Sequence, residues 1–108
     1  MSYESRTVAD QNLATAALTQ FATDFAHLPA ADFSISRIYS DRLTVVLHDD
    51  LADFETWREA LGIAAAAVEF KTLRDFSVVE ADCPWGFATV ELVGYGSLPL
   101  DDSERGAR

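Results

Sequence analysis

The chain has 108 residues, 49% of them hydrophobic and 24% charged, which fits one globular domain able to bury a core without disulfides or a structural metal. Eighteen acidic residues face eight basic ones, giving a net charge of −10 at pH 7. Because nucleic acid and anionic membranes are bound by neutralising phosphates with Lys and Arg, this charge argues against both as direct ligands.

Apolar side chains recur at steps of three and four along residues 8–28, which predicts an amphipathic helix. Thr7 or Asp10 can cap its start, and Pro29 ends it. The residues of the apolar stripe are Leu13, Ala14, Ala17, Leu18, Phe21, Phe25 and Leu28. Such a helix needs a sheet or another helix against its apolar side.

Two alternating runs, 33–39 and 42–48, flank a short polar turn at Ser40-Asp41 and predict an antiparallel hairpin. A second amphipathic helix follows, with Asp50 as its N-cap and Gly62 as the glycine just past its end, where Ile63 can add a hydrophobic contact. The alanines at 64–67 are predicted to form a loose turn. Strands are predicted at 68–73, 76–81 and 87–93, with turns at 74–75 and 82–86.

These elements predict an α+β fold in the order α-β-β-α-β-β-β, with an antiparallel sheet of about five strands and both helices on one face. One domain is expected over residues 1–98, followed by a flexible polar tail at 99–108. A sheet covered on one face can complete itself by dimerisation, so a homodimer is also expected. Neither a membrane-spanning segment nor a signal peptide is recognisable, and the expected location is the cytoplasm.

Three positions are candidates for chemistry. His48 next to Asp49 and Asp50 resembles a general base or metal ligand, but no partner ligand lies at a suitable spacing, which favours a structural role. Cys83 cannot form an internal disulfide, which fits a reducing compartment, and no base that would activate it is identifiable. Trp85 is predicted in a turn, where it either contacts a partner or folds back over the sheet edge.

No phosphate-binding loop, dinucleotide fingerprint, nucleophile elbow or zinc pattern is present, so neither cofactor nor metal is expected. The sequence therefore favours a non-enzymatic protein that binds a basic protein. Its predicted contact residues are on the second helix and in the Trp85 turn: Asp49, Asp53, Glu55, Glu59 and Trp85. The alternative is a small enzyme or ligand-binding domain, with a pocket between sheet and helices lined by His48, Tyr39 and Tyr95.

Residues 47–63 and 90–95 resemble segments of small actinobacterial proteins associated with plasmids, phages and integrated elements. The resemblance implies no activity and no site residues. It favours an accessory protein that acts on another macromolecule.

Overall fold

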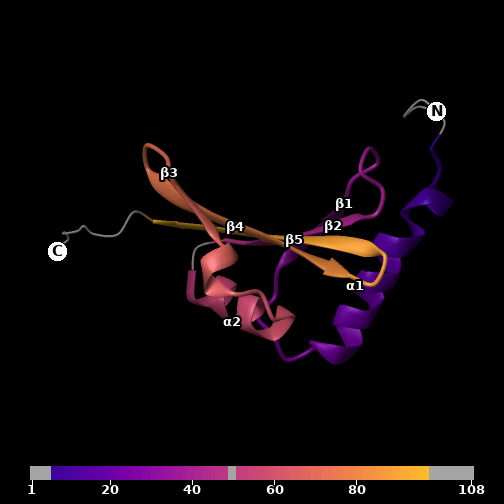
Figure 1. The fold of residues 1–108 in the computed structure, drawn as a ribbon, viewed down its shortest axis with the longest axis horizontal. Helices are drawn as coiled ribbons and strands as arrows, with labels where there is room; N and C mark the ends of the chain where they lie inside the picture. The colour runs from indigo at the N-terminus through magenta and orange to yellow at the C-terminus, as the bar shows by residue number, and fades with distance from the viewer. Residues whose placement is uncertain (1–5, 49–50, 98–108) are drawn as a thin grey trace, which may run out of the picture.

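The computed structural model describes residues 6–48 and 51–97 (Figure 1). Two α-helices and five strands make up the fold, with short 3-10 turns at Val8–Gln11 (η2) and Ala65–Ala67 (η3). The main elements are α1 (Asn12–Asp24), β1 (Asp32–Ile35), β2 (Arg42–Leu47), α2 (Leu51–Leu61), β3 (Glu69–Thr72), β4 (Phe76–Trp85) and β5 (Ala88–Ser97). The predicted α+β class and order of elements are confirmed. Asp49, Asp50 and the predicted tail at 99–108 lie outside the described residues.

The five strands form one sheet in the order β1-β2-β5-β4-β3. The pairs β1–β2, β4–β5 and β3–β4 are antiparallel, whereas β2 and β5 run parallel. The prediction of a purely antiparallel sheet is therefore wrong, and the sheet is mixed. The parallel pair arises because the chain leaves β2 through α2 and returns to it only with its last strand.

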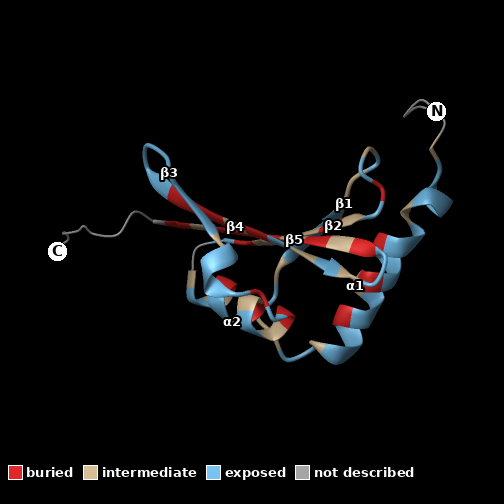
Figure 2. Cartoon of the chain, in the orientation of Figure 1, coloured by how far each residue is buried: buried red, intermediate tan, exposed pale blue. Residues whose placement is uncertain are grey.

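Both helices lie on the same face of the sheet (Figure 1). α1 packs against β1, β2 and β5, and α2 packs against β2 and β5. Figure 2 shows the buried residues gathered in the sheet and on the helix sides that face it. The largest fully buried side chains include Phe21 of α1, Phe54 of α2, Leu43 of β2 and Leu92 of β5. The predicted covered face is thus confirmed, and the opposite face of the sheet carries no helix among the described residues.

The end of α2 follows the predicted pattern. Gly62 has φ +77°, a left-handed conformation that glycine adopts without a side-chain clash. Its N–H donates to the Glu59 carbonyl at 3.1 Å, and the Ile63 N–H donates to the Arg58 carbonyl at 3.1 Å. These two bonds form a Schellman motif, and Ile63 is buried next to it.

Other boundaries differ from the sequence prediction. The α-helical part of the first helix ends at Asp24, four residues before Leu28, and β1 ends at Ile35 rather than at Tyr39. β4 continues through residues 82–85, which were predicted to be a turn, and the β4–β5 turn is the dipeptide Gly86-Phe87. Both strands are consequently ten residues long. Among the described residues, no helix is long and apolar enough to cross a membrane.

Candidate functional site

The predicted acidic surface on α2 is partly neutralised by one arginine. Glu55 accepts hydrogen bonds from Nε and NH2 of Arg58, at 2.8–3.1 Å, and Glu59 lies 3.7 Å from NH2 of Arg58. The hydrogen bonds that Arg58 donates to Glu55 are the main reason that the pKa of Arg58 is raised. Arg58 also donates to the Ile63 carbonyl at 2.6 Å, so these acids help to hold the end of α2. Asp53 is half-buried in the first turn, where the helix dipole favours a carboxylate.

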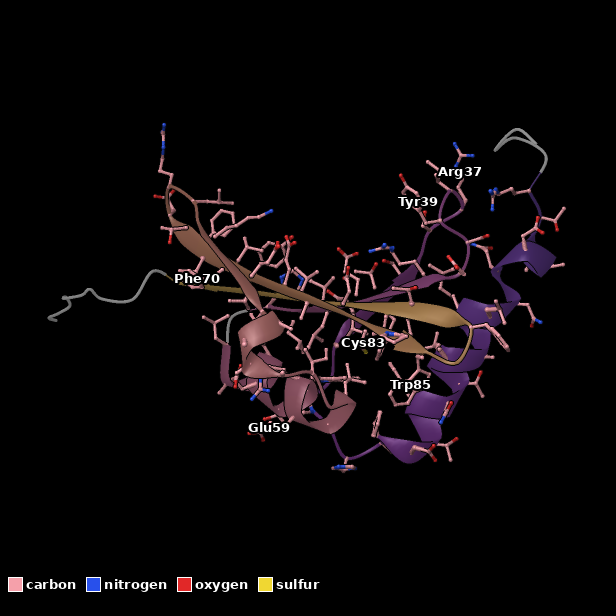
Figure 3. The ribbon with its side chains drawn as sticks, in the orientation of Figure 1. Arg37, Tyr39, Glu59, Phe70, Cys83 and Trp85 are labelled. Carbon is pink, nitrogen blue, oxygen red and sulfur yellow. The ribbon has the colours of Figure 1, made fainter. Side chains whose placement is uncertain are left out.

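Of the three residues proposed to line a pocket, the structure brings His48 and Tyr95 together and places Tyr39 elsewhere. His48 and Tyr95 stack at a centroid distance of 5.6 Å and an interplanar angle of 13°. Both lie on the sheet face opposite the helices, because Leu47 and Gly94, their neighbours in the chain, face the helices. Tyr39 precedes the start of β2, at the other end of that strand, and is 62% exposed (Figure 3). Its nearest recorded ring contact is the Arg42 guanidinium, 5.8 Å from the ring centroid.

Trp85 lies at the end of β4, and its side chain points to the helix side of the sheet (Figure 3). Its ring meets Phe21 of α1 edge-on at 5.2 Å and Phe25 at 5.8 Å. Its indole N–H donates to the Gln20 side-chain oxygen at 3.1 Å. Trp85 thus packs against α1, and Phe87 occupies the turn, with 87% of its surface exposed.

The open face of the sheet, turned away from the helices, carries four carboxylates that sequence reasoning did not select. They are Glu69 of β3, Glu80 and Asp82 of β4, and Glu91 of β5. In the strand register Glu69 is opposite Glu80, and Asp82 is opposite Glu91. Like charges directly opposite each other in a sheet are destabilising unless a cation compensates them. We call these four residues the acidic cluster; together with alanines 67 and 81 they line a hollow of about 260 Å³.

Two cations of the chain compensate part of the acidic cluster. NH1 of Arg42 lies 3.5 Å from a Glu91 oxygen and 3.9 Å from an Asp82 oxygen. Lys71 Nζ lies 3.9 Å from a Glu80 oxygen. Since four carboxylates face two cations, the cluster keeps a negative charge that a basic ligand would balance.

An aromatic row lies on the open face beside the acidic cluster. Phe76, Tyr95 and His48 follow one another across the strands, with a Phe76–Tyr95 centroid distance of 5.9 Å. The valines beneath this row, Val78 and Val93, are only 5% and 7% exposed although no helix of residues 6–48 and 51–97 covers them. His48 also places Nε2 at 3.1 Å from the Asp32 carboxylate, an ion pair when the imidazole is protonated. His48 therefore contacts Tyr95 through its ring and Asp32 through Nε2.

The sequence offers two further kinds of reactive group to locate, a metal site and the thiol of Cys83. Within the described ranges, no three His, Cys, Asp or Glu side chains are grouped so that they could hold a metal ion. Cys83 points to the helix side (Figure 3), and burial, followed by the charge of Asp82, raises the pKa of its thiol. A raised pKa keeps a thiol protonated and poorly nucleophilic at neutral pH.

No protein-family model, curated protein or solved structure matches the chain. The resemblance of residues 47–63 and 90–95 to actinobacterial mobile-element proteins therefore stays a prediction, and the geometry alone carries the functional argument.

A period-two pattern in residues 82–85 could have revealed part of the acidic cluster. Asp82 and Pro84 are exposed, while Cys83 and Trp85 between them are half-buried, as in a strand with one wet face. Proline and the following glycine favoured a turn instead. The approach of Glu91 to Arg42 depends on the pairing of β2 with β5, for which the sequence holds no local signal.

Proposed function

We propose that the protein is a non-enzymatic interaction protein that binds a basic protein partner through the acidic cluster on the open face of its sheet. The observation that carries this proposal is the direct opposition of Asp82 and Glu91, and of Glu69 and Glu80, with fewer cations than carboxylates. Lysine or arginine side chains of a partner would relieve this repulsion. The net charge of −10 would also speed the approach of a basic protein.

The open face is a better candidate for this contact than the α2 surface on which the sequence analysis placed it. On α2, Glu55 and Glu59 already pair with Arg58, which in turn fixes the helix end. A partner would have to compete with those bonds. Glu59 lies on the far side of α2, away from the open face (Figure 3).

The alternative, a ligand pocket between the sheet and the helices, has less support. His48 and Tyr95 lie on the open face, and Tyr39 lies at the other end of β2. A shared small ligand would have to span the length of that strand, roughly 20 Å at 3.3 Å per residue.

Charge-reversal variants test the proposal and its location together. The variant Glu69→Lys/Asp82→Lys alters the acidic cluster, and Asp53→Lys/Glu55→Lys makes the same change in net charge on α2. The immobilised protein is exposed to a cell extract at low and high salt, and the captured basic protein is then purified for binding isotherms. We expect binding that weakens as salt rises, that is lost in the sheet variant, and that persists in the α2 variant.

The opposite pattern, with binding lost only in the α2 variant, would place the contact on α2. Equal binding by both variants and the parent protein would overturn the proposal. Circular dichroism of each variant separates a lost contact from a lost fold.

A further inference from the structure

The open face is divided into an apolar part and an acidic part that share a border. Along the strand register, Tyr95 is opposite Val78, whereas Val93, the next residue of β5 on this face, is opposite Glu80. One step further, Glu91 is opposite Asp82. The face thus changes from aromatic and aliphatic to acidic within two steps along β5.

Several side chains of the apolar part are exposed enough to contact a partner. Phe76 is 37% exposed, and Leu73, which follows β3 at the hairpin tip, is 46% exposed. Tyr95 and Val46 are half-buried, on the same face. Apolar surface of this kind next to polar groups is typical of a contact area with a second macromolecule.

Backbone hydrogen bonding decides which element fits such a face. A single extended segment lying on the face would leave its own N–H and C=O groups without partners, since the sheet offers hydrogen bonds only at its edges. A helix satisfies its backbone internally and can lay an apolar stripe on a sheet. α1 and α2 pack in this way on the other face (Figure 1).

Charge decides against a second copy of this chain as the occupant. The acidic cluster borders the apolar part, so two copies packed through these faces would bring carboxylates against an equally acidic chain of net charge −10. Burying like charges together costs stability unless cations pair with them. A basic helix supplies those cations.

From these relationships we infer that the partner element is an amphipathic α-helix that lies across the open face and carries arginine or lysine along one flank. Its apolar stripe contacts Phe76, Tyr95 and Val46, and its basic flank contacts Glu80, Asp82 and Glu91. The inference rests on the proposed function and adds the form of the partner element to it. It makes the open face the third layer of a helix–sheet–helix sandwich.

Three synthetic peptides of about 18 residues, roughly five helical turns, test the inference with the full-length protein. The first has leucines at helical spacing with arginines on one flank. The second has the same composition in an order that destroys the helical stripe, and the third replaces the arginines of the first by glutamates. Fluorescence anisotropy gives the dissociation constants, and circular dichroism reports peptide helicity on binding. We expect the first peptide to bind about tenfold or more tightly than either control, about 1.4 kcal/mol, and to gain helicity.

Protein variants locate the peptide. Phe76→Ser and Tyr95→Ser are expected to weaken binding of the first peptide by about fivefold or more, on the general scale of an aromatic contact residue. Phe87→Ser removes an even more exposed aromatic side chain outside the face and is expected to leave binding unchanged. Unfolding curves confirm that each variant is folded, and Tyr95→Phe provides a milder change if Tyr95→Ser unfolds.

Each outcome separates the inference from the proposed function. The helical partner is overturned if the first and second peptides bind equally well, or if Phe76→Ser and Tyr95→Ser leave binding of the first peptide unchanged. In either case the proposed function stands if Glu69→Lys/Asp82→Lys still abolishes binding of the basic ligand. If this double variant leaves binding unchanged as well, both the helical partner and the proposed function are overturned. Absence of binding by the first peptide overturns the inference. A homodimer in sedimentation equilibrium that Phe76→Ser dissociates makes a second copy the occupant and overturns it as well.

Discussion

Asp82 on β4 lies directly opposite Glu91 on β5, and the guanidinium of Arg42 approaches both carboxylates, at 3.9 and 3.5 Å. Glu91 in addition accepts a hydrogen bond from the Thr44 hydroxyl at 3.2 Å. The arginine thus lies beside both members of this like-charged pair. This arrangement links the stability of the sheet to the same charges that are proposed to bind a partner.

Removing the arginine should expose that repulsion. We expect Arg42→Met, which keeps much of the aliphatic stem, to lower the free energy of unfolding by about 1 kcal/mol, because exposed pairs of this kind contribute little individually. Urea denaturation at low and high salt measures the effect, which should shrink as salt screens the acids. Adding Asp82→Asn should restore part of the loss. An equal loss at both salts would show that packing, not charge, is responsible.

Local signals predicted the elements that local bonds define. Gly62 marks the end of α2 because the Schellman motif there needs a residue in the left-handed conformation. A single glycine in the sequence is therefore enough to predict this helix end. The antiparallel pairing of β1 and β2 was also predictable from their alternation, but the predicted turn at Ser40-Asp41 is wrong: residues 36–41 connect the strands, and Ile35 pairs with Leu43. Both helices on one face followed from their apolar stripes.

Long-range pairing was not predictable in the same way. β2 and β5 pair in parallel, with more than forty residues between Leu43 and its partner Val90. The sequence of neither strand indicates that it pairs with the other. Pro84 was interpreted as part of a turn, but it lies inside β4. β3 pairs only with residues 77–80, so the part of β4 that contains Pro84 is an edge of the sheet. Proline is tolerated on such an edge. The acidic cluster depends on both features.

Trp85 joins α1 to the end of β4, so its truncation should loosen the helix. The ring packs against Phe21 and Phe25, and full burial of such a side chain is worth about 3–5 kcal/mol on truncation to alanine. Because Trp85 is only half-buried, we expect Trp85→Ala to cost about 2 kcal/mol in urea unfolding. Trp85→Phe should retain most of the packing, and Gln20→Ala should cost only about 1 kcal/mol through the lost hydrogen bond. A loss below that of Gln20→Ala would contradict this role.

Gly94 lets α2 approach β5 closely. A Cβ at this position would lie 2.9 Å from Phe54 Cδ2 and 3.0 Å from Val79 Cγ2. We therefore expect Gly94→Ala to destabilise the fold by about 1–3 kcal/mol through overpacking, measured by thermal or urea unfolding. Because the two sites are in contact, Phe54→Leu should cost less in the Gly94→Ala background than in the parent protein. Additive losses would show that Phe54 is not what the added methyl meets.

Cys83 should react slowly as a nucleophile. Burial, and then the charge of Asp82, raises the pKa of its thiol, so the reactive thiolate is scarce at neutral pH. An ordinary cysteine has a pKa of about 8.5, and we expect iodoacetamide to alkylate Cys83 in the folded protein more slowly than it alkylates a free cysteine at pH 7–8. Because burial is the larger cause of the shift, Asp82→Asn should speed alkylation less than unfolding in urea does.

The raised pKa of Cys83 also fixes the sign of the pH dependence of stability. Above about pH 8.5 the unfolded thiol loses its proton first, so this group lowers the free energy of unfolding as pH rises and has no effect below that range. Cys83→Ser should remove that decline, and alkylation as fast in the folded protein as in urea would contradict the assignment.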